Sequence, residues 1–249
     1  MNLLLLLPSD PTEGELVTIR GERAEHAQRI LGAVPGQTLK AGWLDGPELL
    51  AEVVAVEEGA LVLRAPRGGP VAPRPLTSLW LAIPRPKTLI KVLPEIAALG
   101  IDELCLFRAW KVEKPYLSAE VLEPSRYRPL LHLGLMQARR THEPRVRLEP
   151  LFKPFLEDRA PALSAAAELR LIADPGASTH LASLEIPEDA RVIAAIGPEG
   201  GFIPYEVQAF EALGFRPVRI AERPLRVETA TVVTLGAIEL LRAQAGARR

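Results

Sequence analysis

Apolar and polar positions follow one pattern up to about residue 66 and a different one beyond it. In the first part, short apolar runs recur between turn signals and predict strands at Leu3–Leu7, Leu16–Ile19, Gln37–Trp43, Leu49–Val56 and Ala60–Leu63. The interval Glu22–Leu31 instead has helical spacing. Several short strands at regular spacing indicate a small β-barrel.

From Leu76 onward, strand-like runs alternate with helical patterns. The predicted strands are Leu76–Ile83, Glu103–Phe107, Leu169–Ala173, Val192–Ile196 and Pro217–Ala221. The predicted helices are Lys87–Leu99 capped by Gly100, Ser125–Arg140 with Ser125 as its N-cap, Pro204–Leu213 and Glu228–Ala243. Residues 153–168 predict no clear element. Because Val192–Ile196 contains no polar position, we expect a parallel sheet covered by helices on both faces, an α/β fold.

The two patterns meet in a stretch rich in proline and glycine, Ala65–Pro75. Proline density favours a semi-rigid spacer over a flexible one. The sequence therefore predicts a first domain over residues 1–66, a linker over 67–75 and a second domain over 76–249.

Composition removes several classes of protein. Hydrophobic residues make up 48% of the 249 positions, which excludes a disordered chain. The single cysteine, Cys105, excludes an intramolecular disulfide and a cysteine-rich zinc site, and the four histidines lack metal-ligand spacing, so no metal is expected. No apolar run approaches the roughly 20 residues that span a membrane, so we expect a soluble cytoplasmic protein without membrane contact.

A glycine-rich loop, Gly197–Gly201, directly follows the buried strand Val192–Ile196. Ligands of open α/β sheets bind beyond the carboxyl ends of strands, where glycine lets the backbone approach a ligand closely. The spacing matches neither the dinucleotide fingerprint nor the P-loop, which argues against a nicotinamide enzyme.

Two motifs taken together resemble a known family. Ile196–Phe202 reads IGPEGGF and Leu225–Ala230 reads LRVETA, and this pair is similar to the RsmE family of the SPOUT superfamily. The resemblance implies methylation of uridine N3 in 16S ribosomal RNA of the small subunit, with S-adenosylmethionine as cofactor. It also implies a trefoil-knotted C-terminal domain and an N-terminal PUA-like β-barrel that holds RNA.

The resemblance extends over nearly the whole chain. Gln137–Arg140 with Pro144 looks like a family segment, and Arg126-Tyr127 looks like the family's helix start. Gly32, Glu95 and Ala98 depart from the family pattern.

The resemblance places the cofactor between the two motif loops. The residues expected to bind it are Leu171, Ala195, Ile196, Gly197, Gly200, Gly201, Ile220, Leu225, Val227, Thr229 and Ala230. The strand that precedes Val192–Ile196 ends at Leu171–Asp174, and this end is expected to form a wall of the site.

Methylation at N3 requires loss of the imide proton and stabilisation of the resulting anion. Arg226 is a candidate for stabilising the anion, with Glu228 and then Glu199 as candidate proton acceptors. The alternative is that Arg226 and Glu228 form a structural ion pair that fixes their loop.

Basic residues concentrate between Arg108 and Arg147, although the net charge of the chain is −1. Basic groups hold phosphates, so we expect RNA to be bound by Arg126, Arg139 and Arg140. The resemblance implies a further RNA contact in the first domain, where Arg23 and Arg29 are the candidates to replace the family arginine that is absent at Gly32. The aromatic rings of Trp110, Tyr116 and Tyr127 are expected to be buried, although aromatic rings can also stack on unpaired bases.

The last predicted helix is apolar on more than one face, which is typical of a buried helix. The resemblance implies a homodimer through this C-terminal region, in which the partner completes each site. Two alternatives stay open: methylation of another rRNA or tRNA position, and a non-catalytic RNA-binding protein of ribosome assembly on the same fold.

Overall fold

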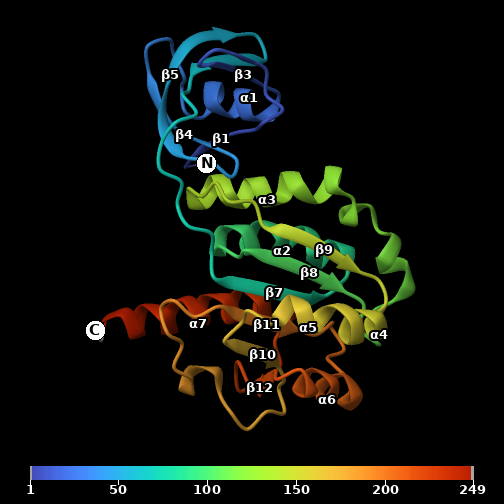
Figure 1. Cartoon of the computed structure of the whole chain (residues 1–249). Helices are drawn as coiled ribbons and strands as arrows, with labels where there is room; N and C mark the ends of the chain where they lie inside the picture. Colours follow the sequence, from blue (N-terminus) through green and yellow to red (C-terminus); the bar gives the residue numbers. More distant parts are fainter. Residues whose placement is uncertain (1, 248–249) are drawn as a thin grey trace. The chain divides into compact units, whose positions relative to one another are not determined.

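The computed structural model describes residues 2–247, which form two compact units (Figure 1). The first unit holds the chain up to Arg74 together with Leu131–Glu143, and the second holds Pro75–Leu130 and the chain from Pro144 onward. The sequence assigns residues 131–143 to the second domain, and the structure differs here. The amides of Asn2 and Leu3 both donate to the carbonyl of Met136, and the Thr141 hydroxyl donates to the carbonyl of Gly46.

The first unit is built on a six-stranded sheet. Its elements are β1 (Leu4–Leu6), β2 (Thr12–Glu13), β3 (Leu16–Arg20), α1 (Glu22–Arg29), β4 (Thr38–Trp43), β5 (Glu48–Glu57) and β6 (Ala60–Arg64). The strand order is β1-β4-β5-β6-β3-β2, with β1 parallel to β4 and every other pair antiparallel. The short strand β2 is not predicted by the sequence.

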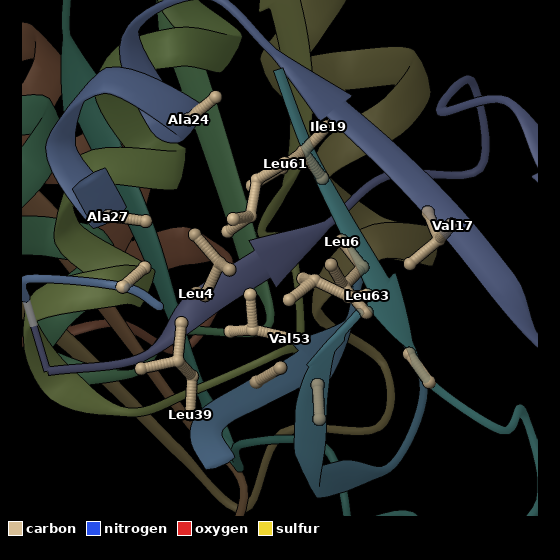
Figure 2. Close-up of a cluster of buried hydrophobic side chains, with 14 of the residues drawn as sticks. Leu4, Leu6, Val17, Ile19, Ala24, Ala27, Leu39, Val53, Leu61 and Leu63 are labelled. Carbon is tan, nitrogen blue, oxygen red and sulfur yellow. The ribbon is translucent and has the colours of Figure 1, made fainter. Parts of the chain in front are cut away.

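Alternation along these strands places one set of side chains inside. Leu4 and Leu6 of β1, Val17 of β3 and Leu61 of β6 point into one apolar cluster (Figure 2). Helix α1 adds small residues, among them Ala24, on its buried side. Because successive side chains point to opposite faces of a strand, one face of each strand supplies this core.

The predicted linker is packed against this unit rather than spanning open solvent. The indole Nε1 of Trp43 donates to the carbonyl of Pro66 over 3.3 Å, and the Arg67 guanidinium lies 3.9 Å from the centre of the Trp43 ring. These contacts, in addition to proline stiffness, hold the segment that follows β6.

The second unit contains the remaining elements. They are β7 (Thr77–Ala82), α2 (Pro86–Leu99), β8 (Glu103–Phe107), η1 (Lys114–Ser118), η2 (Glu120–Leu122), the first part of α3 (Pro124–Ala138), β9 (Arg145–Glu149), α4 (Phe152–Pro154), η3 (Phe155–Arg159), α5 (Ala160–Ser164), β10 (Leu169–Ala173), η4 (Leu181–Ser183), β11 (Val192–Ile196), α6 (Pro204–Ala212), β12 (Arg216–Val218) and α7 (Val227–Ala247).

A six-stranded sheet in the order β12-β10-β11-β7-β8-β9 forms the centre of this unit. Every pair in it is parallel. The chain steps from β7 to β8 and β9 on one side, then crosses to β10 on the other side, and β11 fills the place between β10 and β7. The predicted parallel α/β sheet is confirmed.

Helices cover both faces of this sheet. Trp80 of β7 packs against Phe155 of η3 and Phe210 of α6 on one face. Thr77, an odd-numbered residue of the same strand, accepts a hydrogen bond from Arg242 of α7 on the opposite face. Because side chains alternate along a strand, these contacts place α6 and α7 on different sides.

Three local predictions need correction. The edge strand β9 is missed because its sequence, RVRLE, is mostly polar and lacks the apolar run of a central strand. Helix α3 begins at Pro124, so Ser125 lies inside its first turn and does not cap it; proline suits a first helical position because the amide it lacks has no partner there. Residues 152–164 are helical, although the sequence predicts no clear element there.

Helix α7 runs over Val227–Ala247 and buries one face only. Val233 and Leu240 are 40% and 59% exposed, so the expectation of a helix buried nearly all round does not hold within one chain.

Gly100 ends helix α2 at φ 78°, as predicted.

Candidate functional site

Three loops at the carboxyl ends of neighbouring parallel strands enclose a cavity of about 360 Å³. The loops follow β10, β11 and β12, which pair with one another in the order β12-β10-β11. The cavity is lined by Ala173, Asp174, Pro175, Ile196, Gly197, Pro198, Glu199, Gly200, Gly201, Phe202, Ile220, Ala221, Arg223, Pro224, Leu225, Val227 and Ala230. A volume of this size falls within the range of small-molecule sites.

The glycine loop after β11 is a tight turn. The amide of Gly201 donates to the carbonyl of Pro198 over 2.8 Å, and Gly201 itself has a φ of +67°, a left-handed conformation that side chains disfavour. A Cβ on Gly197 would lie 3.2 Å from the ring and the amide nitrogen of Phe202. Gly201 is therefore needed for its left-handed backbone conformation, and Gly197 is needed for the close approach of Phe202.

Contacts from outside the loop fix its position. The Lys111 ammonium donates to the carbonyl of Gly200 over 2.6 Å, and the backbone amide of Arg85 donates to Oε1 of Glu199 over 2.9 Å. The Lys111 side chain also lies against the Cα of Gly200, where a Cβ would meet it at 2.7 Å. The loop is thus held at two successive residues by the segments that follow β7 and β8.

Glu206 supplies a further connection, which the sequence analysis does not predict. Its carboxylate is 1% exposed and accepts the amide of Ile203 over 2.9 Å and the amide of Trp110 over 2.6 Å. A glutamate at the third position of a helix that begins at Pro204 is the available sequence signal, since it typically binds the amide before the helix. The contact with Trp110 requires the tertiary structure.

A positive charge is held beside Glu199. Arg85 hydrogen-bonds the phenol of Tyr116, and Tyr116 in turn donates to Glu113 over 2.8 Å. The hydrogen bond to Tyr116, together with the charge of Glu199, raises the pKa of Arg85 above its ordinary value. An arginine guanidinium is protonated near neutral pH, so Arg85 contributes a positive charge near Glu199 of the cavity wall.

The third loop carries the second motif into the start of α7. The amide of Ala230 donates to the carbonyl of Arg226 over 2.8 Å and closes the first helical turn. The side chain of Arg226 is exposed and that of Glu228 is half-buried, and neither lines the cavity. Within residues 2–247 these two side chains form no ion pair with each other, so the structure does not support the alternative of a structural pair.

The structure brings most of the predicted cofactor residues into one cavity wall. Eight of them line it: Ile196, Gly197, Gly200, Gly201, Ile220, Leu225, Val227 and Ala230. Leu171 and Ala195 lie within β10 and β11 at 1% and 0% exposure, and Thr229 is exposed on α7. Glu199, a predicted catalytic residue, also lines the cavity.

Other lining residues are absent from the predicted set. Arg223 and Pro224 precede the second motif, and Phe202 ends the first one. Asp174 lies at the end of β10, where the sequence predicts a wall, and its Oδ1 accepts the amide of Gly176 over 2.9 Å. These loops can be identified in the sequence because each one directly follows a predicted strand.

The predicted RNA-binding arginines differ in their surroundings. Arg23 is engaged within the first unit, where it pairs with Asp10 over 2.6 Å and donates to the carbonyl of Leu5. Arg29 and Arg140 are exposed. Arg126 is 65% exposed and lies 3.5 Å from Glu120, and Arg139 is exposed with a φ of 56° at the end of α3.

The prediction that the Trp110 ring is buried is wrong, because Trp110 is 77% exposed. Among the described residues no group of three or more histidine, cysteine, aspartate or glutamate side chains is arranged to hold a metal. No helix within residues 2–247 is both long and apolar enough to cross a bilayer.

Comparison with known proteins identifies the family of this chain. A family described as an RNA methyltransferase domain matches residues 72–239, which is more than half of the chain. The chain belongs to this family. The match covers the parallel sheet and all three cavity loops, and the resemblance to the RsmE family is confirmed.

Relatives extend the likeness over both units. The ribosomal RNA small subunit methyltransferase E of Treponema pallidum is 29% identical over 253 residues, covering 100% of this chain and 94% of the relative. A crystal structure of a ribosomal RNA small subunit methyltransferase E from Neisseria gonorrhoeae, bound to S-adenosyl methionine, shares the fold with a TM-score of 0.76 at 20% identity, covering 97% and 98% of the two chains. A Legionella pneumophila methyltransferase structure with bound SAM gives a TM-score of 0.74 at 22% identity, covering 98% of each chain.

Proposed function

We propose that this protein methylates N3 of a uridine in 16S ribosomal RNA of the small subunit, with S-adenosylmethionine as methyl donor. The observation that carries the proposal is the three-loop cavity, because it unites the two sequence motifs on the carboxyl side of a parallel sheet. Membership in an RNA methyltransferase family and likeness to small-subunit methyltransferases E support the same reaction.

The residues around the cavity suit this cofactor. Apolar side chains of Ile196, Ile220, Leu225 and Val227 offer a slot for an adenine ring, and the glycine loop exposes backbone groups without a Cβ in the way. Carboxylates of Asp174 and Glu199 on the wall suit a ligand that carries a positive sulfonium and an amino group. When bound, the cofactor supplies an electrophilic methyl group.

Protein side chains would accept the proton from uridine N3 and stabilise the negative charge that remains. Glu199 is one candidate proton acceptor, because it lines the cavity and is fixed by the amide of Arg85. Glu228 is the other, and Arg226 is the candidate that stabilises the uridine anion. Both lie at the start of α7, on either side of the lining residue Val227, and we propose that they approach the substrate from the side of the third loop.

Exposed arginines would hold the RNA backbone. Arg126 in the second unit and Arg29, Arg139 and Arg140 in the first are accessible to phosphates, whereas Arg23 has a structural ion pair to break first. An rRNA substrate implies a cytoplasmic protein.

Three structural features belong to the same proposal. We infer a trefoil knot in the second unit from the family resemblance, and a PUA-like barrel from the same resemblance and the six-stranded sheet of the first unit. We also infer a homodimer through α7, because its exposed apolar residues Val233 and Leu240 lack cover within one chain.

The decisive experiment is transfer of a radiolabelled methyl group to small subunits from a strain that lacks the enzyme. We expect one methyl group per subunit, and mass spectrometry of the digested RNA should identify 3-methyluridine. Methylation of a different base or of a ribose would support the alternative target. Cofactor-independent RNA binding with no transfer would support the non-catalytic alternative.

A further inference from the structure

Trp110 is held rigidly in an exposed position. It is 77% exposed, while its neighbours Ala109 and Val112 are 1% and 4% exposed and anchor the backbone on either side. The amide of Val112 donates to the carbonyl of Ala109, which closes a turn around Trp110. The ring therefore projects from a fixed backbone rather than from a free loop.

Two contacts connect this turn to the cavity. Glu206 binds the amide of Trp110 through one oxygen and the amide of Ile203, directly after the lining residue Phe202, through the other. The next residue, Lys111, binds the carbonyl of Gly200 in the cavity wall. Trp110 thus lies next to the residue that contacts the glycine loop, on the segment that follows β8.

Cationic side chains accompany the exposed ring. Lys111 and Lys114 are exposed, and Arg85 lies beside Glu199. Among the carboxylates nearby, Glu206 is buried, whereas Glu113 and Glu199 keep their negative charge, because the phenol of Tyr116 and the amide of Arg85 that they accept are neutral donors. Cations around an exposed aromatic ring are the combination that binds single-stranded RNA.

We propose that Trp110 is a stacking platform for an unpaired RNA base beside the cavity and thereby a determinant of substrate specificity. The inference rests on the proposed function and deepens it, because it names unpaired RNA as the form that the enzyme selects. A base in a duplex has both faces covered by its neighbours, so the indole ring contacts only a base that is already unstacked.

Kinetics with unmethylated small subunits test the role. Trp110→Ala should raise the KM for the subunit about 5- to 160-fold, which is the loss of one base–aromatic stack converted to a ratio, and leave the affinity for S-adenosylmethionine unchanged. Trp110→Phe should restore most of the loss. Tyr205→Ala removes another exposed ring, at 55% exposure on α6, and should leave KM unchanged.

Fluorescence provides a readout that does not require methyl transfer. Trp43 and Trp80 are 4% and 0% exposed, so iodide should quench the emission of Trp110 selectively. Short single-stranded RNA should protect this emission from iodide, whereas a fully paired RNA of the same length should not.

The possible failures are distinguishable. If wild-type protein transfers no methyl group but single-stranded RNA still protects Trp110, the proposed reaction fails and the stacking role stands. An unchanged KM for Trp110→Ala, an equal rise for Tyr205→Ala, or equal protection by paired RNA overturns the stacking role. Protection at high protein concentration without RNA, with loss of dimers in sedimentation of Trp110→Ala, would assign the ring to a contact between copies.

Discussion

At the scale of single residues, the glycine loop shows how similar residues serve different physical ends. Gly201 is required by a φ of +67° and has open space around its Cα, whereas Gly197 is required by the ring of Phe202. Glycine-richness identifies the loop from the sequence alone. Which glycine meets which constraint depends on backbone angles and neighbours that only the folded chain supplies.

Gly201→Val should weaken binding of S-adenosylmethionine about tenfold or more, because a branched residue in a left-handed conformation costs about 1–2 kcal/mol and shifts the turn. Calorimetric titration measures the affinity. Gly68→Val is the matched control, since Gly68 has open space and no positive φ, and it should bind the cofactor like wild type. Wild-type affinity for Gly201→Val would remove the loop from the site.

Glu206→Ala should destabilise the protein by about 2–5 kcal/mol, because two backbone amides lose their partner and each unmet buried donor costs about 1–3 kcal/mol. Glu206→Gln keeps one acceptor oxygen and should cost less. Urea denaturation gives the free energy of unfolding for both variants. Equal stability of all three proteins would show that solvent replaces the carboxylate.

At the scale of elements, helix ends and helix faces explain where the sequence-based boundaries shift. Helix α3 ends in a Schellman-type motif, in which the amide of Arg140 donates to the carbonyl of Leu135 over 3.0 Å and Arg139 is left-handed. A non-glycine residue at that position gives no signal in the sequence, so the predicted helix runs on to Arg140.

Arg139→Gly should raise stability by about 0.5–1 kcal/mol, because it relieves the left-handed strain at the end of α3 and glycine's greater chain entropy offsets only part of that gain. Thermal unfolding followed by circular dichroism measures the change. The same variant should weaken RNA binding if Arg139 contacts phosphate. Arg139→Ala keeps the strain, so only its RNA affinity should fall, and a lower melting temperature for Arg139→Gly would contradict the motif.

Helix α6 is positioned by an aromatic cluster that links the sheet to the glycine loop. Phe210 contacts Trp80, Phe107 and Phe202, among other rings, with centroid separations between 5.0 and 6.3 Å. Phe210→Ala should cost about 3–5 kcal/mol in unfolding free energy through the cavity it leaves. Phe210→Leu fills more of the space and should cost less; identical losses in urea denaturation would exclude a packing origin.

At the scale of the whole molecule, the chain's single cysteine lies buried in the parallel sheet of the second unit. The parallel sheet brings together residues from Thr77 to Val218, so its integrity depends on contacts far apart in the sequence. Cys105 lies in the middle of β8 at 0% exposure.

Cys105 should resist alkylation in the native protein and react fully once the second unit unfolds. Burial, together with the nearby carboxylates of Glu149 and Glu103, raises the pKa of its thiol, so little thiolate is present near neutral pH. Labelling with iodoacetamide across a urea series, read by mass spectrometry, should follow the unfolding curve. Rapid labelling without denaturant would show that the sheet opens locally at β8.

The sequence by itself determined the alternation of strands and helices, the parallel sheet and the two loops that carry the motifs. These follow from local signals, namely fully apolar strand runs, helical spacing of apolar residues and glycine after strands, each of which acts within a few residues. Local signals of this kind, together with the family resemblance of the two motifs, are enough to assign Ile196–Gly201 and Leu225–Ala230 to one site.

Only the tertiary structure decided the rest. It assigned residues 131–143 to the first unit, paired the polar strand β9 with the sheet, engaged Arg23 with Asp10 and left Trp110 exposed. The reason is the same in each case. A side chain's burial and partners depend on segments distant in sequence, such as Glu206 for Trp110, and no local pattern contains them.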